Sequence, residues 1–382
     1  MPYETLLDDS AAATHLIAQA PDTFLLIYTS GTTGKAKGVM LGNGIELEVA
    51  REAALSHAAA QTDRMLIVMP FYHIGGPIEM LTYLVVGAAI VLHRTFDAGE
   101  ILRSIERHRV TAAHLAPTMI QMLLDVAEKQ SCDVSSLHTI CYASAPMSVS
   151  LSRRARAMFG PIFMQIYAMT ESGLGTVLFK HQHVLDGPPH VVKRLASAGQ
   201  PYLSADIRVV RDDGTDCVVG EVGEIWTRTP LVMQGYWRRP EATAAAFAHG
   251  YLKTGDMGYW DDDHFLFIVD RKKDMIVSGG ENIYSREVEE ALLVHPAVAE
   301  AAVIGIPHAR WGETVMAFVV LRPGLKASEE LLVEHCKTLI ASYKKPSKVE
   351  FLEAMPRVQS TNKIDKKSLR APFWATFDRQ VS

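Results

Sequence analysis

Apolar residues follow two alternating patterns in the first half of the chain. Short apolar runs, FLLI at 24–27, MLIV at 65–68 and AAIVL at 88–92, are bounded by polar residues or glycine. Between them, at 44–60 and 77–86, apolar residues recur at helical spacing. Short apolar runs predict buried strands, and the longer stretches predict amphipathic helices. The alternation therefore predicts a mostly parallel β-sheet covered by helices.

The pattern changes near Ser197. Strand-like segments separated by Gly and Asp pairs continue to about residue 270, and such pairs mark hairpins. A third pattern follows, with helices at 285–294 and 328–342 and strands AEAAVIGI, VMAFVVL and KVEFLE. We therefore predict an α/β fold class with three parts: an α/β core at 1–196, a β-rich subdomain of the core at 197–270, and a small α+β domain at 271–382.

Composition excludes several classes of protein. The chain has 382 residues, 48% of them hydrophobic, and a net charge of −5, which favours small ligands and no nucleic-acid partner. The most apolar segment, 80–92, is too short to span a bilayer, and the N-terminus MPYETLLDDS does not resemble a signal peptide. The four cysteines lack CxxC spacing, which argues against a disulfide framework or a zinc site. We expect a cytoplasmic protein with ordinary buried thiols.

The segment YTSGTTGKAKGVM at 28–40 combines glycines with hydroxyl and lysine side chains. Glycine permits backbone conformations that turn successive N–H groups toward one point, and such an arrangement attracts phosphate. The glycine spacing differs from that of a Walker A loop, and no Ser or Thr follows the lysine. Taken alone, the segment fits both a phosphate-binding loop and a flexible Ser/Thr/Gly turn.

Five further segments follow in the chain: MPFYHIGG at 69–76, IYAMTE at 166–171, YLKTGD at 251–256, DRKKDMIVSGGENIY at 270–284 and TNKIDK at 361–366. Together with 28–40 they resemble, in order and over nearly the whole chain, the motifs of the adenylate-forming (AMP-binding) superfamily. This superfamily includes acyl- and aryl-CoA synthetases, luciferases and the adenylation domains of nonribosomal peptide synthetases. One such match is weak evidence, whereas six in the same order identify the resemblance.

The resemblance implies an acyl-CoA synthetase. Such an enzyme joins a small-molecule carboxylic acid to the α-phosphorus of ATP, expels pyrophosphate, and passes the acyl group from AMP to CoA. It implies ATP, Mg²⁺ and CoA as cofactors, and a C-terminal domain that is mobile. Both steps place negative charge on phosphate oxygens, so the site needs cations and fixed donors there.

The resemblance also assigns residues to the nucleotide and its metal. It places the β- and γ-phosphates on Thr29, Ser30, Gly31, Thr32, Thr33, Gly34 and Lys35, and magnesium on Thr32 and Glu171. It places the nucleotide on Tyr167, Thr170, Ser144, Ala145, Pro146, Asp256 and Arg271. Taken singly, a Tyr and a Thr at a strand end or an Asp in a turn are common features without function. Only the combined motifs favour the functional interpretation.

Three residues are implied in catalysis: Lys363, His73 and Glu171. Lys363 would bridge the acyl carboxylate and the α-phosphate, although locally it resembles part of a solvated basic tail. His73 would orient the acceptor carboxylate, although a lone histidine in an apolar loop is more often a satisfied core residue. The resemblance also places a hinge at Lys273 and the path of the CoA arm at Ser278, Gly279 and Gly280.

The sequence departs from the superfamily pattern at several positions. Ala36 stands where Pro is usual, and Asn362 replaces Gly before Lys363. Ala168 replaces Gly after Tyr167, which would cost about 1 kcal/mol if the position needs a positive φ. Members of the superfamily carry a long segment before the phosphate loop. Without it, we expect exposed apolar edges, a homodimer that covers them, or a compact variant.

Three functions remain open from the sequence. The first is an acyl-CoA synthetase for a fatty or aryl acid, because SGLGTV at 172–177 offers small residues and no cation. The second is an amino-acid adenylation module, although PFYHIGGP at 70–77 lacks the acidic residue expected to pair with a substrate ammonium. The third is a truncated, inactive relative that binds nucleotide or a partner.

Overall fold

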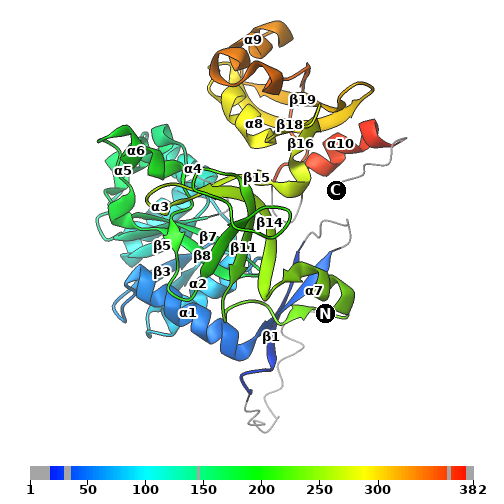
Figure 1. Cartoon of the computed structure of the whole chain (residues 1–382). Helices are drawn as coiled ribbons and strands as arrows, with labels where there is room; N and C mark the ends of the chain where they lie inside the picture. The colour runs from blue at the N-terminus through cyan, green and yellow to red at the C-terminus, as the bar shows by residue number, and fades with distance from the viewer. Residues whose placement is uncertain (1–17, 30–35, 144–146, 359–362, 376–382) are drawn as a thin grey trace, which may run out of the picture.

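The computed structural model describes residues 18–29, 36–143, 147–358 and 363–375. Figure 1 shows a large region, coloured from blue to green, and a smaller region in yellow to red above it. The α/β fold with a β-rich part and a small α+β part is confirmed. The boundaries at 196/197 and 270/271 stay predictions. None of the helices in the described ranges combines the length and apolar character that crossing a membrane requires.

A seven-stranded sheet forms the centre of the large region. Its strand order is β4-β3-β5-β6-β7-β8-β9. The bounds are β3 (Arg64–Ile67), β4 (Ala89–Leu92), β5 (Ala112–Leu115), β6 (Thr139–Tyr142), β7 (Phe163–Met169), β8 (Gly173–Leu178) and β9 (Gln200–Pro201). The strands from β4 to β7 are parallel, and β8 and β9 join antiparallel. The predicted mostly parallel sheet is therefore present.

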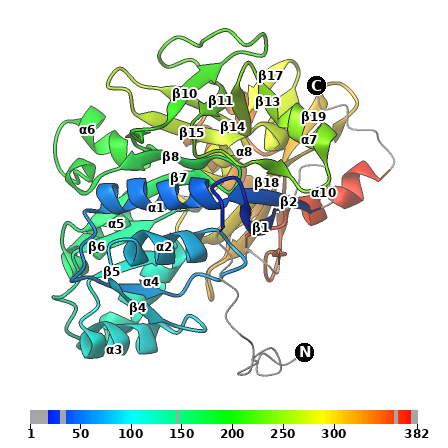
Figure 2. The same cartoon turned by 90° about the horizontal axis from the view of Figure 1, so that it is seen from below.

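Helices cover both faces of this sheet (Figure 2). They are α1 (Asn43–His57), α2 (Gly75–Leu84), α3 (Ala98–His108), α4 (Pro117–Ala127) and α5 (Val149–Phe159). Successive strand residues point to opposite faces. Thus Leu66 joins the core formed with α3, α4 and α5, whereas Met65 and Ile67 pack with Tyr83 of α2. The near-continuous apolar character of the strands follows from this burial on both sides.

The first apolar run does not belong to the central sheet. Residues 24–27 lie in β1 (Thr23–Thr29), which pairs antiparallel with β2 (Lys37–Gly42), and β2 pairs with β12 (Gly235–Tyr236). Phe24 and Tyr28 are 47% and 61% exposed. The expectation of a buried strand of the parallel sheet is therefore wrong for this run. Four apolar residues are compatible with either sheet, and the pairing partner decides between them.

The β-rich part is an antiparallel sheet. Its strands are β10 (Asp206–Val210), β11 (Gly223–Arg228), β13 (Phe247–Ala248), β14 (Tyr251–Trp260) and β15 (Leu266–Arg271). Their order is β10-β11-β14-β13, with β15 paired to β14. The short helix α7 (Pro240–Ala246) lies in the same part of the chain, and α6 (Pro189–Lys193) precedes it. Its longest strand, β14, carries residues of the candidate site described below.

The smaller region is a sheet with helices on both faces. Its strands are β16 (Ile276–Ser278), β17 (Glu281–Ile283), β18 (Val298–His308), β19 (Gly312–Leu321) and β20 (Lys348–Phe351), and its helices are α8 (Ser285–Leu293), α9 (Glu329–Leu339) and α10 (Lys366–Trp374). Helices α8 and α9 pack on one face, and Leu369 of α10 packs on the other. Ser328 caps α9 by accepting a hydrogen bond from the Leu331 N–H. The predicted small α+β unit is thus present.

Glu46 of α1 gives the fold a pH dependence. Its side chain is 3% exposed, and burial raises its pKa from 4.5 to about 7. Since the folded pKa exceeds the unfolded one, the full stability is present below pH 4.5 and is lost as the pH rises through 7. The loss amounts to about 3 kcal/mol. Glu46→Gln should therefore raise the melting temperature at pH 8 but not at pH 4.

The control for this change is Glu48→Gln on the same helix. The Glu48 side chain is 58% exposed and pairs with Arg51. Thermal unfolding of both variants and the parent chain between pH 4 and 8 measures the effect. A stability gain of Glu46→Gln that does not depend on pH would contradict the assignment.

Candidate nucleotide-binding site

Glu171 lies where three elements meet. It follows β7, is 9% exposed, and accepts hydrogen bonds at Oε1 from the Thr29 hydroxyl (3.0 Å) and the Tyr236 hydroxyl (3.3 Å). Its backbone carbonyl accepts a hydrogen bond from the Met233 N–H at 2.9 Å. The end of β1, the end of β7 and β12 therefore meet at one carboxylate. Among the described residues no hydrogen bond reaches Oε2, and this oxygen suits a magnesium ion.

Asp256 forms a second polar centre on β14. Its Oδ1 lies 2.8 Å from Arg271 Nε, and its Oδ2 accepts a hydrogen bond from the Tyr167 hydroxyl at 2.8 Å. Asp256 and Arg271 are direct cross-strand partners of β14 and β15. Burial raises the pKa of Asp256, and the charge of Arg271 opposes this effect. Each carboxylate oxygen can accept a second hydrogen bond, so two ribose hydroxyls can still be recognised.

Lys363 reaches the same site from the smaller region. Its charge lowers the pKa of both Asp256 and His73. Its backbone carbonyl accepts a hydrogen bond from the Val358 N–H at 2.9 Å. The Lys363 side chain is exposed to solvent, and its partial enclosure by the surrounding protein, followed by repulsion from Arg271, lowers its pKa. The charge of this lysine thus acts on two of the predicted site residues, and its role in adenylation stays a prediction.

His73 presents one ring nitrogen to the site. Its Nδ1 accepts a hydrogen bond from the Gly75 N–H at 3.1 Å. Burial lowers the pKa of His73, and the charges of Lys363 and His114 lower it further. The ring is therefore neutral near pH 7, and its proton lies on Nε2. A neutral Nε2–H can donate a hydrogen bond to a substrate carboxylate.

Several predicted site residues lie outside the described part of the chain. They are Ser30, Gly31, Thr32, Thr33, Gly34, Lys35, Ser144, Ala145 and Pro146. Thr170 is described and half-buried directly before Glu171, and its role at the α-phosphate stays a prediction. Thr29 belongs to the predicted phosphate loop and is described, and its hydroxyl contacts Glu171.

The charged run DRKKD at 270–274 is held by polar contacts. Asp270 Oδ2 accepts hydrogen bonds from the backbone N–H (2.5 Å) and hydroxyl (2.8 Å) of Ser285 in α8. Lys272 Nζ lies 2.8 Å from Asp212 and 3.2 Å from Glu224. The expectation that few contacts hold this run is therefore wrong, because its charges pair with both neighbouring parts. The hinge role of Lys273 stays a prediction.

The glycine pair at 279–280 forms the turn between β16 and β17. Gly279 and Gly280 have φ angles of +61° and +88°, which favour glycine. A Cβ atom on Gly279 would lie 2.9 Å from the Trp311 ring. Ser278 precedes this turn and pairs with Gly312. The structure thus explains the glycines locally, and the CoA-binding role of the three residues stays a prediction.

Ala168 causes no backbone strain. The described residues other than glycine that have a positive φ are Ala58, Arg109, Arg238, His249 and His264. Ala168 lies in β7 and is not among them. The substitution therefore avoids the expected cost, while Asn362 lies outside the described residues.

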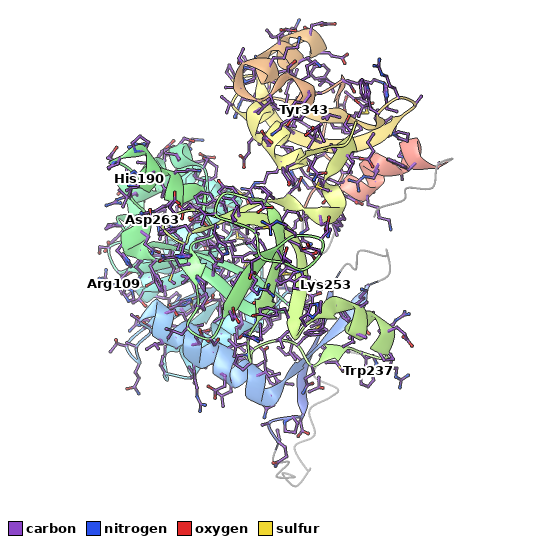
Figure 3. All side chains as sticks on the ribbon, viewed as in Figure 1. Arg109, His190, Trp237, Lys253, Asp263 and Tyr343 are labelled. Carbon is purple, nitrogen blue, oxygen red and sulfur yellow. The ribbon has the colours of Figure 1, made fainter. Side chains whose placement is uncertain are left out.

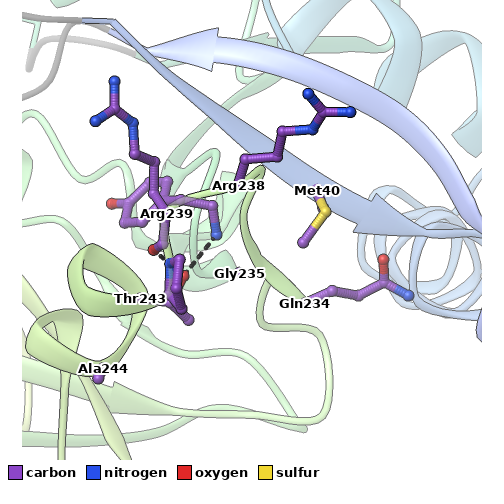
Figure 4. Close-up of a pocket in the computed structure, with 9 residues that line it drawn as sticks. Met40, Gln234, Gly235, Arg238, Arg239, Thr243 and Ala244 are labelled. Atoms are coloured by element: carbon purple, nitrogen blue, oxygen red, sulfur yellow. Dashed lines mark hydrogen bonds between the residues drawn. The ribbon is translucent and has the colours of Figure 1, made fainter.

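Tyr236 is a site residue that the sequence reasoning missed. Its hydroxyl contacts Glu171, and Lys37 Nζ lies 4.7 Å from the centre of its ring. A tyrosine 65 positions from its partner gives no spacing signal. Its backbone also lines a pocket between β2 and α7, where the Tyr236 N–H donates to Thr243 Oγ1 at 2.9 Å (Figure 4). Figure 3 shows the next residue, Trp237, at the outer edge beside α7.

The chain is similar to known CoA ligases over most of its length. The 2-succinylbenzoate–CoA ligase of Bacillus subtilis (strain 168) is 40% identical over 352 residues, which are 92% of this chain and 69% of that protein. A feruloyl-CoA synthase of an Amycolatopsis species is 39% identical over 353 residues, 92% of this chain and 70% of that protein. The solved o-succinylbenzoate CoA synthetase of Bacillus subtilis with ATP and magnesium is 37% identical and superposes with a TM-score of 0.82 over 93% of this chain and 72% of that one.

Two family descriptions match the chain in the expected order. Residues 3–237 match the AMP-binding enzyme family, and residues 287–362 match the AMP-binding enzyme C-terminal domain. The first match includes Thr29, Glu171 and Tyr236 and ends before β14, and the second spans most of the smaller region. The chain belongs to the AMP-binding enzyme family.

Proposed function

We propose that the chain is an AMP-forming acyl-CoA synthetase that activates an aryl or fatty carboxylic acid with ATP and transfers it to CoA. Similar proteins are CoA ligases for aromatic and fatty acids. The observation that carries the proposal is the contact of Asp256 with Arg271 and Tyr167, together with the charge of Lys363 acting on Asp256. We assign Asp256 to nucleotide recognition, His73 to orientation of the carboxylate, and Lys363 to the supply of a cation.

In the first step a carboxylate oxygen attacks the α-phosphorus of ATP, and pyrophosphate leaves. Lys363 would hold the acyl carboxylate against the α-phosphate and offset the developing negative charge. The His73 Nε2–H would orient the carboxylate. Tyr167, Asp256 and Arg271 would bind the adenosine part of the nucleotide. Glu171, with Thr32, would hold Mg²⁺, which stabilises negative charge on the phosphate oxygens.

In the second step the CoA thiol attacks the acyl-adenylate carbonyl, and AMP leaves. We assign Lys273 as the pivot about which the domain at 271–382 turns, relative to the core at 1–196 and 197–270. Ser278, Gly279 and Gly280 would line the path of the CoA arm. The positive φ of both glycines supports the assignment of the CoA path, because it keeps these two positions without side chains: a side chain there would be strained. A homodimer and a cytoplasmic location stay predictions from the sequence.

A pyrophosphate-release assay tests the proposal. Fatty acids of increasing chain length, benzoates and cinnamates are supplied with ATP and Mg²⁺, with and without CoA, and the thioester product is identified by mass spectrometry. We expect release with an aryl or fatty acid and a thioester only with CoA. Release that needs an amino acid would instead indicate an adenylation module. Absence of release, together with thermal stabilisation by ATP, would indicate an inactive nucleotide-binding relative.

A further inference from the structure

A buried cluster of metal-binding side chains lies between the central sheet and the helices α1 and α2. It consists of His57 at the end of α1, Glu79 in α2 and Cys141 in β6, which are 1%, 3% and 1% exposed. One ligand atom from each residue lies within 4.8 Å of the other two. The proposed nucleotide chemistry uses none of these three residues.

The contacts within the cluster leave Glu79 Oε2 without a hydrogen bond. His57 Nδ1 lies 3.7 Å from Glu79 Oε2, whereas Cys141 Sγ lies 3.7 Å from His57 Nδ1 and 3.5 Å from Nε2, within reach of a weak hydrogen bond from the thiol. An N–H···O hydrogen bond ends at about 3.2 Å. Among the described residues, Glu79 Oε2 has no hydrogen-bond partner although it is buried. A buried polar atom without a partner indicates a water molecule or an ion that fills the gap.

The spacing within the cluster is closer to that of metal ligands than to that of groups bridged by a water molecule. Zinc binds nitrogen and oxygen at about 2.0–2.1 Å and sulfur at about 2.3 Å, so tetrahedral ligand atoms lie about 3.3–3.6 Å apart. A bridging water would hold its partners about 4.5 Å apart, because each hydrogen bond is about 2.8 Å long. The two separations of 3.7 Å from His57 Nδ1 are close to the zinc value.

The surroundings of the cluster also suit a metal. His114 Nδ1 lies 2.9 Å from Glu79 Oε1, and a ligating carboxylate is commonly fixed by such an outer contact. His114 and Cys141 are neighbours across the parallel strands β5 and β6. A carboxylate, a thiolate and a neutral imidazole around a divalent cation carry no net charge, which lowers the cost of their burial. The mixed nitrogen, oxygen and sulfur donors favour zinc over magnesium or calcium.

We propose that His57, Glu79 and Cys141 bind a zinc ion that links α1 and α2 to the central sheet. The fourth position would be open to a water or to the Tyr202 hydroxyl, which is buried and has no hydrogen-bond partner within the described ranges. The sequence-based expectation of ordinary thiols and no zinc site differs from this proposal. The ligands stand at 57, 79 and 141, and only the packing of three separate elements brings them together.

The cluster is also linked to His73 through the first residue of α2. A Cβ atom on Gly75 would lie 3.2 Å from His73 Nδ1 and 3.7 Å from His114 Cε1, so both rings flank this glycine. His114 therefore connects the cluster to the catalytic region through direct packing. A metal at the cluster would fix α2, whose first residue, Gly75, donates its N–H to His73.

Cobalt(II) titration of the full chain tests the proposal. The protein is treated with a chelator under reducing conditions, and Co²⁺ is added while the absorption spectrum is recorded. We expect one Co²⁺ per chain, a thiolate-to-cobalt charge-transfer band, tetrahedral d–d bands, and displacement of Co²⁺ by Zn²⁺. Cys141→Ser should abolish the charge-transfer band and weaken binding at least about tenfold. His114→Gln should keep the band and weaken binding by about 10–100-fold.

The matched control is Cys336→Ser, because Cys336 is a fully buried thiol in the smaller region. It should leave the spectrum and the stoichiometry unchanged. The proposal is overturned if the parent chain shows no stoichiometric thiolate band, or if Cys141→Ser retains it. If circular dichroism shows that Cys141→Ser does not fold, the cobalt spectra of the parent chain, Cys336→Ser and His114→Gln still test the proposal. Loss of the band in Cys336→Ser would then refute the site.

Discussion

Replacement of Lys363 by alanine should reduce adenylate formation by about 10²–10³-fold, the usual cost of removing one preorganised charge donor. The charge of Lys363 acts on Asp256 and His73, the residues assigned to the nucleotide and to the acyl carboxylate. Its loss leaves the developing negative charge without this cation. Pyrophosphate release with the acid found in the substrate screen measures the effect. Thioester formation from preformed acyl-adenylate should be largely unchanged, because that step does not need this contact.

Lys367→Ala is the matched control for this prediction. Lys367 is an exposed lysine four residues further along the same segment. Its removal changes the net charge equally but should not affect either step. If Lys363→Ala slowed both half-reactions to the same extent, its assignment to adenylation would be wrong.

Replacement of Glu171 by glutamine should reduce adenylation by about 10²-fold and raise the magnesium concentration needed for half-maximal rate. An amide has nearly the shape of a carboxylate but lacks its charge, and Mg²⁺ is bound mainly by charged oxygens and water. The hydroxyls of Thr29 and Tyr236 can still donate to the amide oxygen, so the local structure should persist. Rates of pyrophosphate release across a Mg²⁺ titration measure both effects.

Tyr236→Phe separates the lost charge from a lost hydrogen bond. It removes one of the two hydroxyl donors to Glu171 Oε1 but keeps the ring below Lys37. We expect less than about a tenfold change and an unaltered magnesium dependence, since a single neutral hydrogen bond contributes about 1 kcal/mol. A Glu171→Gln variant with the magnesium dependence of the parent chain would argue against metal binding by this carboxylate.

Local patterns were sufficient for most helices and strands but not for their exact ends. The helix predicted at 44–60 ends at His57, because Ala58 adopts a left-handed conformation with φ of 54°. The helix predicted at 77–86 instead covers Gly75–Leu84. Apolar periodicity reports which residues can face a core, whereas helix ends depend on backbone conformations and caps that short-range patterns specify weakly.

The order of the motifs allowed the nucleotide residues to be predicted together. In the structure, different interactions bring different members of this set together. Asp256 and Arg271 meet because β14 and β15 pair in one register. The charge of Lys363 acts on Asp256 only because the smaller region lies over the large one. Tyr236 was missed, because nothing near it in the sequence indicates Glu171 as its partner.

The sequence by itself determined the fold class, the family resemblance and the residue types of the nucleotide site. These depend on local periodicity and on motifs whose residues are close together in the chain. The tertiary structure decided that β1 leaves the parallel sheet, that polar contacts hold the run after β15, and that His57, Glu79 and Cys141 converge. The physical reason is that strand pairing and side-chain clustering are interactions between distant segments, and their partners are selected only when the whole core packs.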